Sequence, residues 1–219
     1  MDTNSNIQSN IQYKRASRIL AVFIVASGII LGIYNIFFSD SYYILLAFAF
    51  CLFPLVPPLL DRLLKIRPVY VIHFTLLLFL ILSYGIGMVL NGYHRIPYFD
   101  KLMHLLSGIV FTIVGSCLFY VFKTEQNIEP GDAALNCFFS FDFSLAVAAI
   151  WEILEYLIDL ILHNDPQNVL TTGVHDTMQD IIACLAGTLV VVLYLYLYYK
   201  KNRHSLFSRI IENFHSINL

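Results

Sequence analysis

The amino-acid sequence predicts an all-α protein: a polytopic transmembrane helical bundle of about six spans, with both termini in the cytoplasm and a short amphipathic helix in the C-terminal tail. The first observation is composition, because 58% of the 219 residues are hydrophobic and only 13% are charged. That composition cannot supply the polar surface that a soluble domain of this length needs. The second is a series of apolar runs long enough to cross a bilayer core of about 30 Å. The third is an uneven distribution of Lys and Arg between alternate loops.

The apolar runs follow one another with short polar breaks, at about 19–38, 42–60, 69–90, 100–122, 138–162 and 174–199. No A-x-A cleavage site follows the first run, so we expect a retained first helix and not a signal peptide. The second run contains Pro54, Pro57 and Pro58. A helix there should be kinked or end early, because proline lacks an N–H and clashes with the preceding turn.

Loop charges predict the orientation of the bundle. Basic residues gather before the first run, after the second run and after the last: Lys14, Arg15, Arg18, Arg62, Lys65, Arg67, Lys200, Lys201, Arg203 and Arg209. The loops at 39–41 and 163–173 carry none, and the loop at 91–98 carries only Arg95. Since basic loops stay in the cytoplasm, both termini should lie inside. We therefore predict a polar cytoplasmic N-terminus (1–18), a six-helix transmembrane domain (19–199) and a basic amphipathic cytoplasmic tail (200–219).

The tail has its own pattern. Apolar residues repeat there at helical spacing among polar ones: Leu206, Phe207, Ile210, Ile211, Phe214 and Ile217. The pattern predicts a short helix that lies with its apolar face on the cytoplasmic leaflet, aided by nearby Lys and Arg. The alternative is a frayed, disordered tail.

Composition also limits the partners. The net charge of −2 implies no nucleic-acid partner. Four cysteines are scattered without a C-x-x-C pair: Cys51, Cys117, Cys137 and Cys184. We interpret them as small buried apolar residues and not as a disulfide framework. The expected partner is the lipid bilayer itself, and the oligomeric state is left open.

Ionisable side chains inside the spans indicate a polar site. Each costs several kcal/mol in a membrane unless it is paired or solvated. They occur as Asp100 and His104 in the fourth run, Glu152, Glu155 and Asp159 in the fifth, and Asp176 and Asp180 in the sixth. Within each run the spacing of three, four or seven residues puts the side chains on one helix face. The predicted topology places all three sets at similar depth in the outer half of the bundle.

Charge balance points to a cation among these acids, because crowded carboxylates in a poorly solvated site cannot all stay ionised alone. The nearby fixed cations are only Lys101 and Arg95. Carboxylates and imidazole on facing helices are typical of a metal site. We predict a divalent metal ion of unspecified identity held by Asp100, His104, Glu152, Glu155, Asp176 and Asp180. The alternative is that these side chains only tie helices together by hydrogen bonds.

Three motifs carry a family resemblance: Tyr98-Phe99-Asp100-Lys101-x-x-His104, Trp151-Glu152-x-x-Glu155 and Gly173-Val174-x-Asp176-Thr177-x-x-Asp180. In this order they resemble the YjdF-like bacterial inner-membrane proteins, over roughly residues 97–187. A looser similarity connects the Asp-Lys-x-x-His start to VanZ-like proteins, which are associated with glycopeptide-antibiotic resistance. Those tend to have E-x-x-Q where this chain has Glu152-x-x-Glu155. The resemblance implies a cell-membrane location and one polar site, and it implies no reaction.

Three functions fit these observations. The first is a membrane-embedded, metal-assisted enzyme that acts on a lipid or cell-envelope headgroup. His104 or Glu155 would be the candidate general base, and the candidate substrate contacts are Arg95, Lys101 and His175. The second is a cation or proton-coupled transporter, which needs a polar path across the bundle. Its inner half offers few polar side chains: Ser116, Cys117, Ser140, Asp142 and Ser144. The third is a non-catalytic membrane partner or immunity-type protein.

Overall fold

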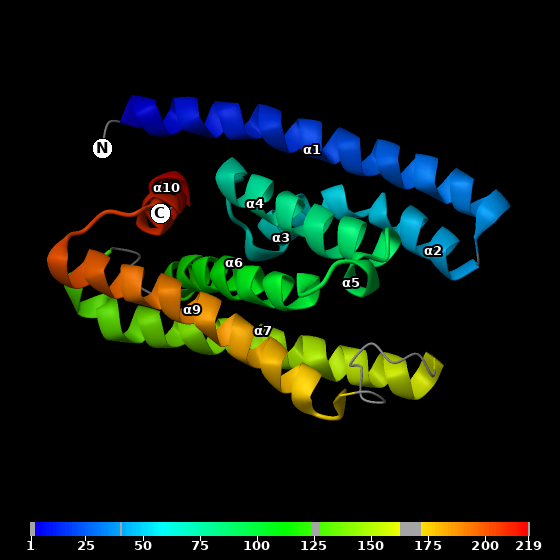
Figure 1. The fold of residues 1–219 in the computed structure, drawn as a ribbon. Helices are drawn as coiled ribbons and strands as arrows, with labels where there is room; N and C mark the ends of the chain where they lie inside the picture. Colours follow the sequence, from blue (N-terminus) through cyan, green and yellow to red (C-terminus); the bar gives the residue numbers. More distant parts are fainter. Residues whose placement is uncertain (1–2, 40, 124–127, 163–171, 219) are drawn as a thin grey trace. The chain divides into compact units, whose positions relative to one another are not determined.

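The computed structural model describes residues 3–39, 41–123, 128–162 and 172–218, and this part of the chain is helical without a strand, which confirms the all-α fold class. The helices are α1 (Thr3–Phe38), α2 (Ser41–Phe50), α3 (Val56–Leu64), α4 (Tyr70–Leu80), α5 (Gly92–Arg95), α6 (Phe99–Phe122), α7 (Ala133–Leu162), α9 (His175–Lys201) and α10 (Leu206–Asn218) (Figure 1). Short 3₁₀ turns occur at Phe53–Leu55 and Pro130–Asp132, and a π-helical segment, Ile81–Val89, continues α4.

Six stretches of the described chain are long and apolar enough to cross a membrane: Asn10–Phe38, Ser41–Leu64, Tyr70–Val89, Phe99–Phe122, Pro130–Ile161 and His175–Lys201. They correspond one to one with the six apolar runs and confirm the polytopic bundle. The first and fifth begin earlier than the runs do, because both helices extend into polar sequence. The cytoplasmic placement of the two termini and the division at residues 18 and 199 stay predictions.

The second span is interrupted, as its prolines predict. Helix α2 ends at Phe50, a 3₁₀ turn containing Pro54 follows, and α3 resumes with Pro57 and Pro58 in its first turn. A proline in the first turn costs no hydrogen bond, because the N–H groups there have no partner within the helix. The three prolines therefore divide the span into two helices.

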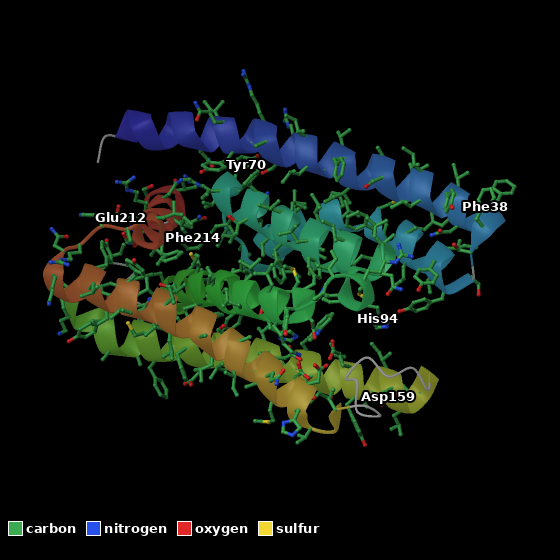
Figure 2. The ribbon with its side chains drawn as sticks, in the orientation of Figure 1. Phe38, Tyr70, His94, Asp159, Glu212 and Phe214 are labelled. Carbon is green, nitrogen blue, oxygen red and sulfur yellow. The ribbon has the colours of Figure 1, made fainter. Side chains whose placement is uncertain are left out.

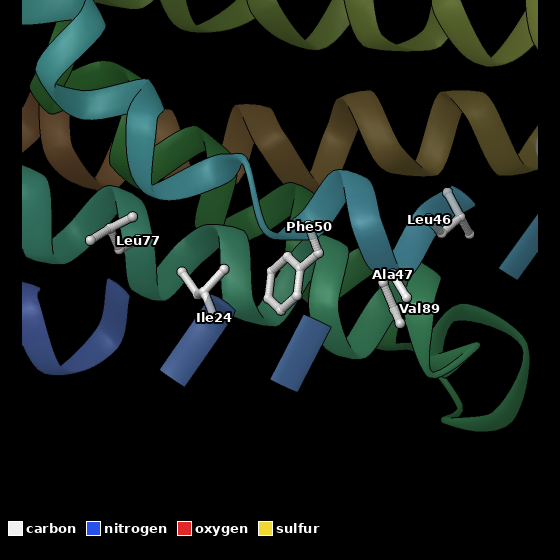
Figure 3. Close-up of a cluster of buried hydrophobic side chains, with 6 residues drawn as sticks. All are labelled: Ile24, Leu46, Ala47, Phe50, Leu77 and Val89. Carbon is white, nitrogen blue, oxygen red and sulfur yellow. The ribbon is translucent and has the colours of Figure 1, made fainter. Parts of the chain in front are cut away.

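The chain forms two compact units, which we describe separately. Unit 1 comprises residues 1–99 and 216–218, and unit 2 comprises residues 100–215. The core of unit 1 is an apolar cluster contributed by α1, α2, α4 and the π-helical segment (Figure 3). Its buried members are Ile24, Leu46, Ala47, Phe50, Leu77 and Val89.

Unit 2 is built on α6, α7 and α9, and α7 and α9 run side by side along much of their length (Figure 1). Helices α6 and α9 cross backbone against backbone. A Cβ atom at Gly108 would overlap the carbonyl oxygen of Cys184, and one at Gly187 would overlap the carbonyl oxygen of Leu105. Only glycine permits this approach on both helices. The crossing therefore holds α6 and α9 against each other at Gly108 and Gly187.

The tail forms the predicted helix, α10, with a strongly amphipathic pattern. Its Ile211 and Phe214 are buried, with exposed fractions of 0% and 2%. At its start Phe207 packs edge-on against Tyr194 of α9, with ring centroids 5.5 Å apart. We expected the whole apolar face of this helix to contact the leaflet. Instead the protein itself covers Ile211 and Phe214. Figure 2 marks Phe214 and Glu212 on this helix.

Candidate functional site

Three helices of unit 2 bring the ionisable side chains together. Helices α6 and α9 begin toward the end of the unit at which α7 ends, and the last turns of α7 extend beyond them (Figure 1). Asp100 and His104 are one turn apart on α6, and Asp176 and Asp180 are one turn apart on α9. Glu152 faces them from α7, with 7% of its side chain exposed.

Lys101 lies at the centre of three aspartates. Its ammonium nitrogen is 2.5 Å from Asp176 Oδ1 and 2.8 Å from both carboxylate oxygens of Asp180. Asp100 Oδ2 lies 3.5 Å away, and the backbone carbonyl of Asp176 accepts a further bond at 3.4 Å. Lys101 was predicted as a substrate contact, and the geometry makes it the main counter-charge of the cluster.

His104 lies on the other side of the same acids. Its Nε2 atom is 3.6 Å from Asp100 Oδ1 and 3.7 Å from Glu152 Oε1. Asp180 Oδ1 is 3.9 Å from that nitrogen. These distances exceed the hydrogen-bond range of about 2.7–3.2 Å. They are close to the spacing of neighbouring ligands on one ion, because donors about 2.1 Å from a tetrahedral metal lie about 3.4 Å apart.

These distances define a candidate set of metal ligands. One donor atom each from Asp100, His104 and Asp180 lie within 4.8 Å of one another. Glu152 lies beside this set through its contact with His104. Both nitrogen and oxygen donors are present, which suits zinc, manganese or iron better than calcium. These residues therefore fit a divalent transition-metal ion.

The exposed fraction of the side chains differs across the cluster. Asp180, Glu152 and His104 have 2%, 7% and 7% of their side chains exposed. Lys101 and Asp100 retain 22% and 26%. Exposure therefore increases from Asp180, Glu152 and His104 toward the first turn of α6.

The other predicted residues lie around this core. Glu155 accepts a hydrogen bond of 2.8 Å from Trp151 Nε1, and His175 is exposed at the start of α9. Asp159 is half-buried near the end of α7 (Figure 2). Arg95 is exposed and belongs to unit 1, so the structure does not assign it to the cluster. Part of the loop at 163–173 lies outside the described residues.

Unit 1 holds a His–Asp contact that the sequence reasoning missed. His73 Nε2 of α4 lies 2.7 Å from Asp61 Oδ2 of α3, with 10% and 14% of the side chains exposed. The available signal was the same as for the main site, namely ionisable residues inside two of the membrane spans. Asp61 and His73 are separated by a proline-containing loop, so no motif spacing identified them.

The core of unit 2 also contains more polar side chains than expected. Ser144 Oγ of α7 lies 2.8 Å from Thr188 Oγ1 of α9, and both side chains are fully buried. Farther along α6 and α7, Ser116 Oγ donates to Asn136 Oδ1 at 2.8 Å.

Near the opposite end of the unit, the phenol oxygens of Tyr120 and Tyr199 are 2.7 Å apart. Tyr120 also contacts Asp132, which is paired with Lys123 at 2.8 Å. Buried polar groups thus recur from the acidic cluster to the far end of the unit, where the sequence had indicated a blocked path.

Comparisons with known proteins identify the family. A protein of Thermotoga maritima named only "Uncharacterized protein" is 32% identical over 113 residues, which cover 50% of this chain and 54% of that protein. The chain thus spans about half the length of this curated relative. No solved structure matches. The looser similarity to VanZ-like proteins has no support among these findings. Residues 16–201 match the family model described as "Predicted membrane protein (DUF2238)". The match covers most of the chain and all of the helices that form the site, and the chain therefore belongs to this family of multi-pass membrane proteins.

Proposed function

We propose that this protein is a metal-assisted enzyme of the cell membrane that acts on a lipid or cell-envelope headgroup. The YjdF-like resemblance supports the cytoplasmic membrane of a bacterium as its location. The Lys and Arg distribution supports an orientation with both termini in the cytoplasm, which puts the acidic cluster in the outer half of the bundle. In that orientation the cluster faces the outer leaflet and its headgroups.

One observation carries the proposal: His104 Nε2 lies 3.6–3.9 Å from carboxylate oxygens that come from three different helices. If these groups only tied the helices together, His104 should donate to one of them at ordinary hydrogen-bond distance. Instead its nitrogen is nearly equidistant from all three. Donor atoms of Asp100, His104 and Asp180 also lie within 4.8 Å of one another, as the ligands of one ion must.

The residues of this chain have distinct roles in the proposal. Asp100, His104 and Asp180 hold the ion, and Glu152 completes or steadies the set. A divalent ion in such a site can bind a phosphate oxygen or activate water. Glu155, one turn beyond Glu152 on α7, is the candidate general base, since His104 is engaged as a ligand. Lys101 is the candidate contact for the anionic part of the headgroup.

The test is a measurement of bound metal and thermal unfolding in detergent. Purified wild type should contain about one equivalent of a divalent metal, and a chelator should lower its melting temperature. At 100 times the dissociation constant, bound metal adds about 2.7 kcal/mol of stability. His104→Gln should abolish both effects. Asp159→Asn is the matched control, because it removes an acid from the same end of α7 outside the ligand set.

A wild type that carries no metal and ignores both chelator and added Mn²⁺ or Zn²⁺ would overturn the enzyme proposal. The acids and His104 would then be interhelical contacts, and a non-catalytic membrane partner or immunity-type protein would be the better assignment.

A second candidate function, proton-coupled transport, is favoured by the buried polar side chains along unit 2. A transporter needs polar groups across the whole bundle, and the Ser144–Thr188 and Tyr120–Tyr199 contacts continue beyond the acidic cluster. Serine and threonine hydroxyls also serve as packing contacts in membranes, so the contacts alone do not decide.

Proteoliposomes that enclose a pH-sensitive dye distinguish the two functions. Proton flux in wild type that falls in Thr188→Val and survives in the exposed-site variant Asp142→Asn would favour transport. Absence of flux in wild type would remove this candidate.

A further inference from the structure

We propose that Lys101 is a built-in competitor for the metal ion, and that metal binding releases it from Asp180 so that it can bind the phosphate of an anionic headgroup. The inference rests on the proposed metal site and adds its regulation and substrate class.

Asp180 is shared between two functions. Its Oδ1 atom lies 2.8 Å from the Lys101 ammonium and 3.9 Å from His104 Nε2, on the side of the candidate ligands. Its Oδ2 atom is also 2.8 Å from Lys101. Lys101 therefore lies close to both oxygens but donates a hydrogen bond to Oδ2, and the buried Oδ1 accepts none within the described part of the chain. An incoming divalent ion must take at least one of them.

A divalent ion and an ammonium group repel each other at this range, especially where little water screens them. Asp180 has only 2% of its side chain exposed, so it cannot move outward to serve both cations. Lys101 can move, because its side chain is long and 22% exposed. Binding of an ion to Asp180 therefore favours displacement of Lys101, not of the aspartate.

The displaced ammonium retains one partner. Asp176 Oδ1 is 2.5 Å from Lys101, lies outside the ligand set and sits in the first turn of α9. Lys101 should pivot toward that turn, where a headgroup phosphate arrives. Its charge then serves the substrate, since a lysine ammonium binds phosphate as a point charge. Metal and phosphate binding become coupled, and the coupling is reciprocal.

The direct test is Mn²⁺ binding to the detergent-purified full chain, by calorimetry or electron paramagnetic resonance. Lys101→Gln should bind Mn²⁺ about tenfold more tightly than wild type, within the usual range for coupled sites. Lys101→Arg, which keeps the charge, should resemble wild type. Lys123→Gln is the matched control: it also removes a lysine paired with an aspartate in unit 2, at the other end of α6.

A second measurement uses wild type alone and does not depend on a variant that folds. Lysines are acetylated in trace amounts and quantified by mass spectrometry with and without Mn²⁺. Displacement from Asp180 should raise the labelling rate of Lys101 severalfold and leave that of Lys123 unchanged. Adding sn-glycerol 1-phosphate with Mn²⁺ should lower the Lys101 rate again, whereas the phosphate alone should have a smaller effect.

The outcomes separate the two proposals. Metal binding by wild type with equal or weaker binding by Lys101→Gln, and no change in Lys101 labelling, overturns the competitor role and leaves the metal site standing. Mn²⁺ binding that is seen only in Lys101→Gln overturns the coupling, because wild type would then hold no ion that could displace Lys101. If neither protein binds Mn²⁺ or Zn²⁺, both the metal site and this inference fail.

Discussion

At the scale of single residues, the sequence predicted which side chains meet but not how they share their charges. Helical spacing and equal membrane depth were sufficient to bring His104, Glu152 and Asp180 to one place. The sequence could not predict which basic residue would lie among the acids, because Lys101 and Arg95 each contribute one positive charge near them. Only the rotation of α6 about its axis decides that Lys101 turns inward between Asp176 and Asp180.

A first prediction concerns that ion pair. Asp180→Asn should destabilise the protein by about 1.5–3 kcal/mol, because it removes a charge-assisted contact of Lys101, which keeps Asp176 as a partner. The measurement is denaturant unfolding with a chelator present, so that loss of a metal ligand does not contribute. Asp142→Asn, at an exposed position on α7, should change stability by less than about 0.5 kcal/mol. Equal effects of the two substitutions would show that the Lys101 contacts add nothing.

At the scale of helices, the sequence predicted features that local backbone chemistry determines. It did not predict features that depend on packing between helices. The prolines at 54, 57 and 58 predicted the division of the second span, since their effect depends on the backbone alone. The π-helical segment at Ile81–Val89 had no such signal. Likewise the sequence correctly predicted that α10 is amphipathic. The spacing of its apolar residues does not determine whether lipid or protein covers Ile211 and Phe214.

The second prediction concerns the crossing of α6 and α9. Gly187→Ala should destabilise the protein by about 1–3 kcal/mol, because the added methyl group meets the Leu105 carbonyl and drives two backbones apart. Thermal unfolding in detergent provides the measurement. Gly131→Ala is the control, because it makes the same substitution at a position where an added Cβ meets no atom within 4 Å. Overlapping melting curves for the two variants would mean that the helices do not touch as described.

At the scale of the whole molecule, hydropathy was enough to predict six spans, because a bilayer crossing requires one long apolar helix and little else. The separation into two compact units was not predictable, since it depends on contacts between segments far apart in sequence. The orientation depends on loop charges, and no contact inside the protein reports it.

The third prediction therefore concerns topology. In a variant whose native cysteines are replaced, Asn168→Cys should react in intact cells with a membrane-impermeant maleimide, and Arg62→Cys should react only after the membrane is opened. Arg62 lies in the last turn of α3 and position 168 in the loop 163–173, and the charge bias places these two on opposite sides. Labelling of Arg62→Cys from outside, with protection of Asn168→Cys, would reverse the orientation and place the acidic cluster in the inner half.

The geometry of the site depends on the angle at which α6 and α9 cross at their glycines. Asp180 lies seven residues before Gly187, which is about 10 Å along the helix axis. A change of about 10° in the crossing angle would therefore move the Asp180 carboxylate by nearly 2 Å, enough to separate it from His104 as a co-ligand. The geometry of the proposed ion site thus depends on the absence of side chains at Gly108 of α6 and Gly187 of α9. Substitutions far from any charged group, at the pivot itself, can retune the site as effectively as the loss of a ligand.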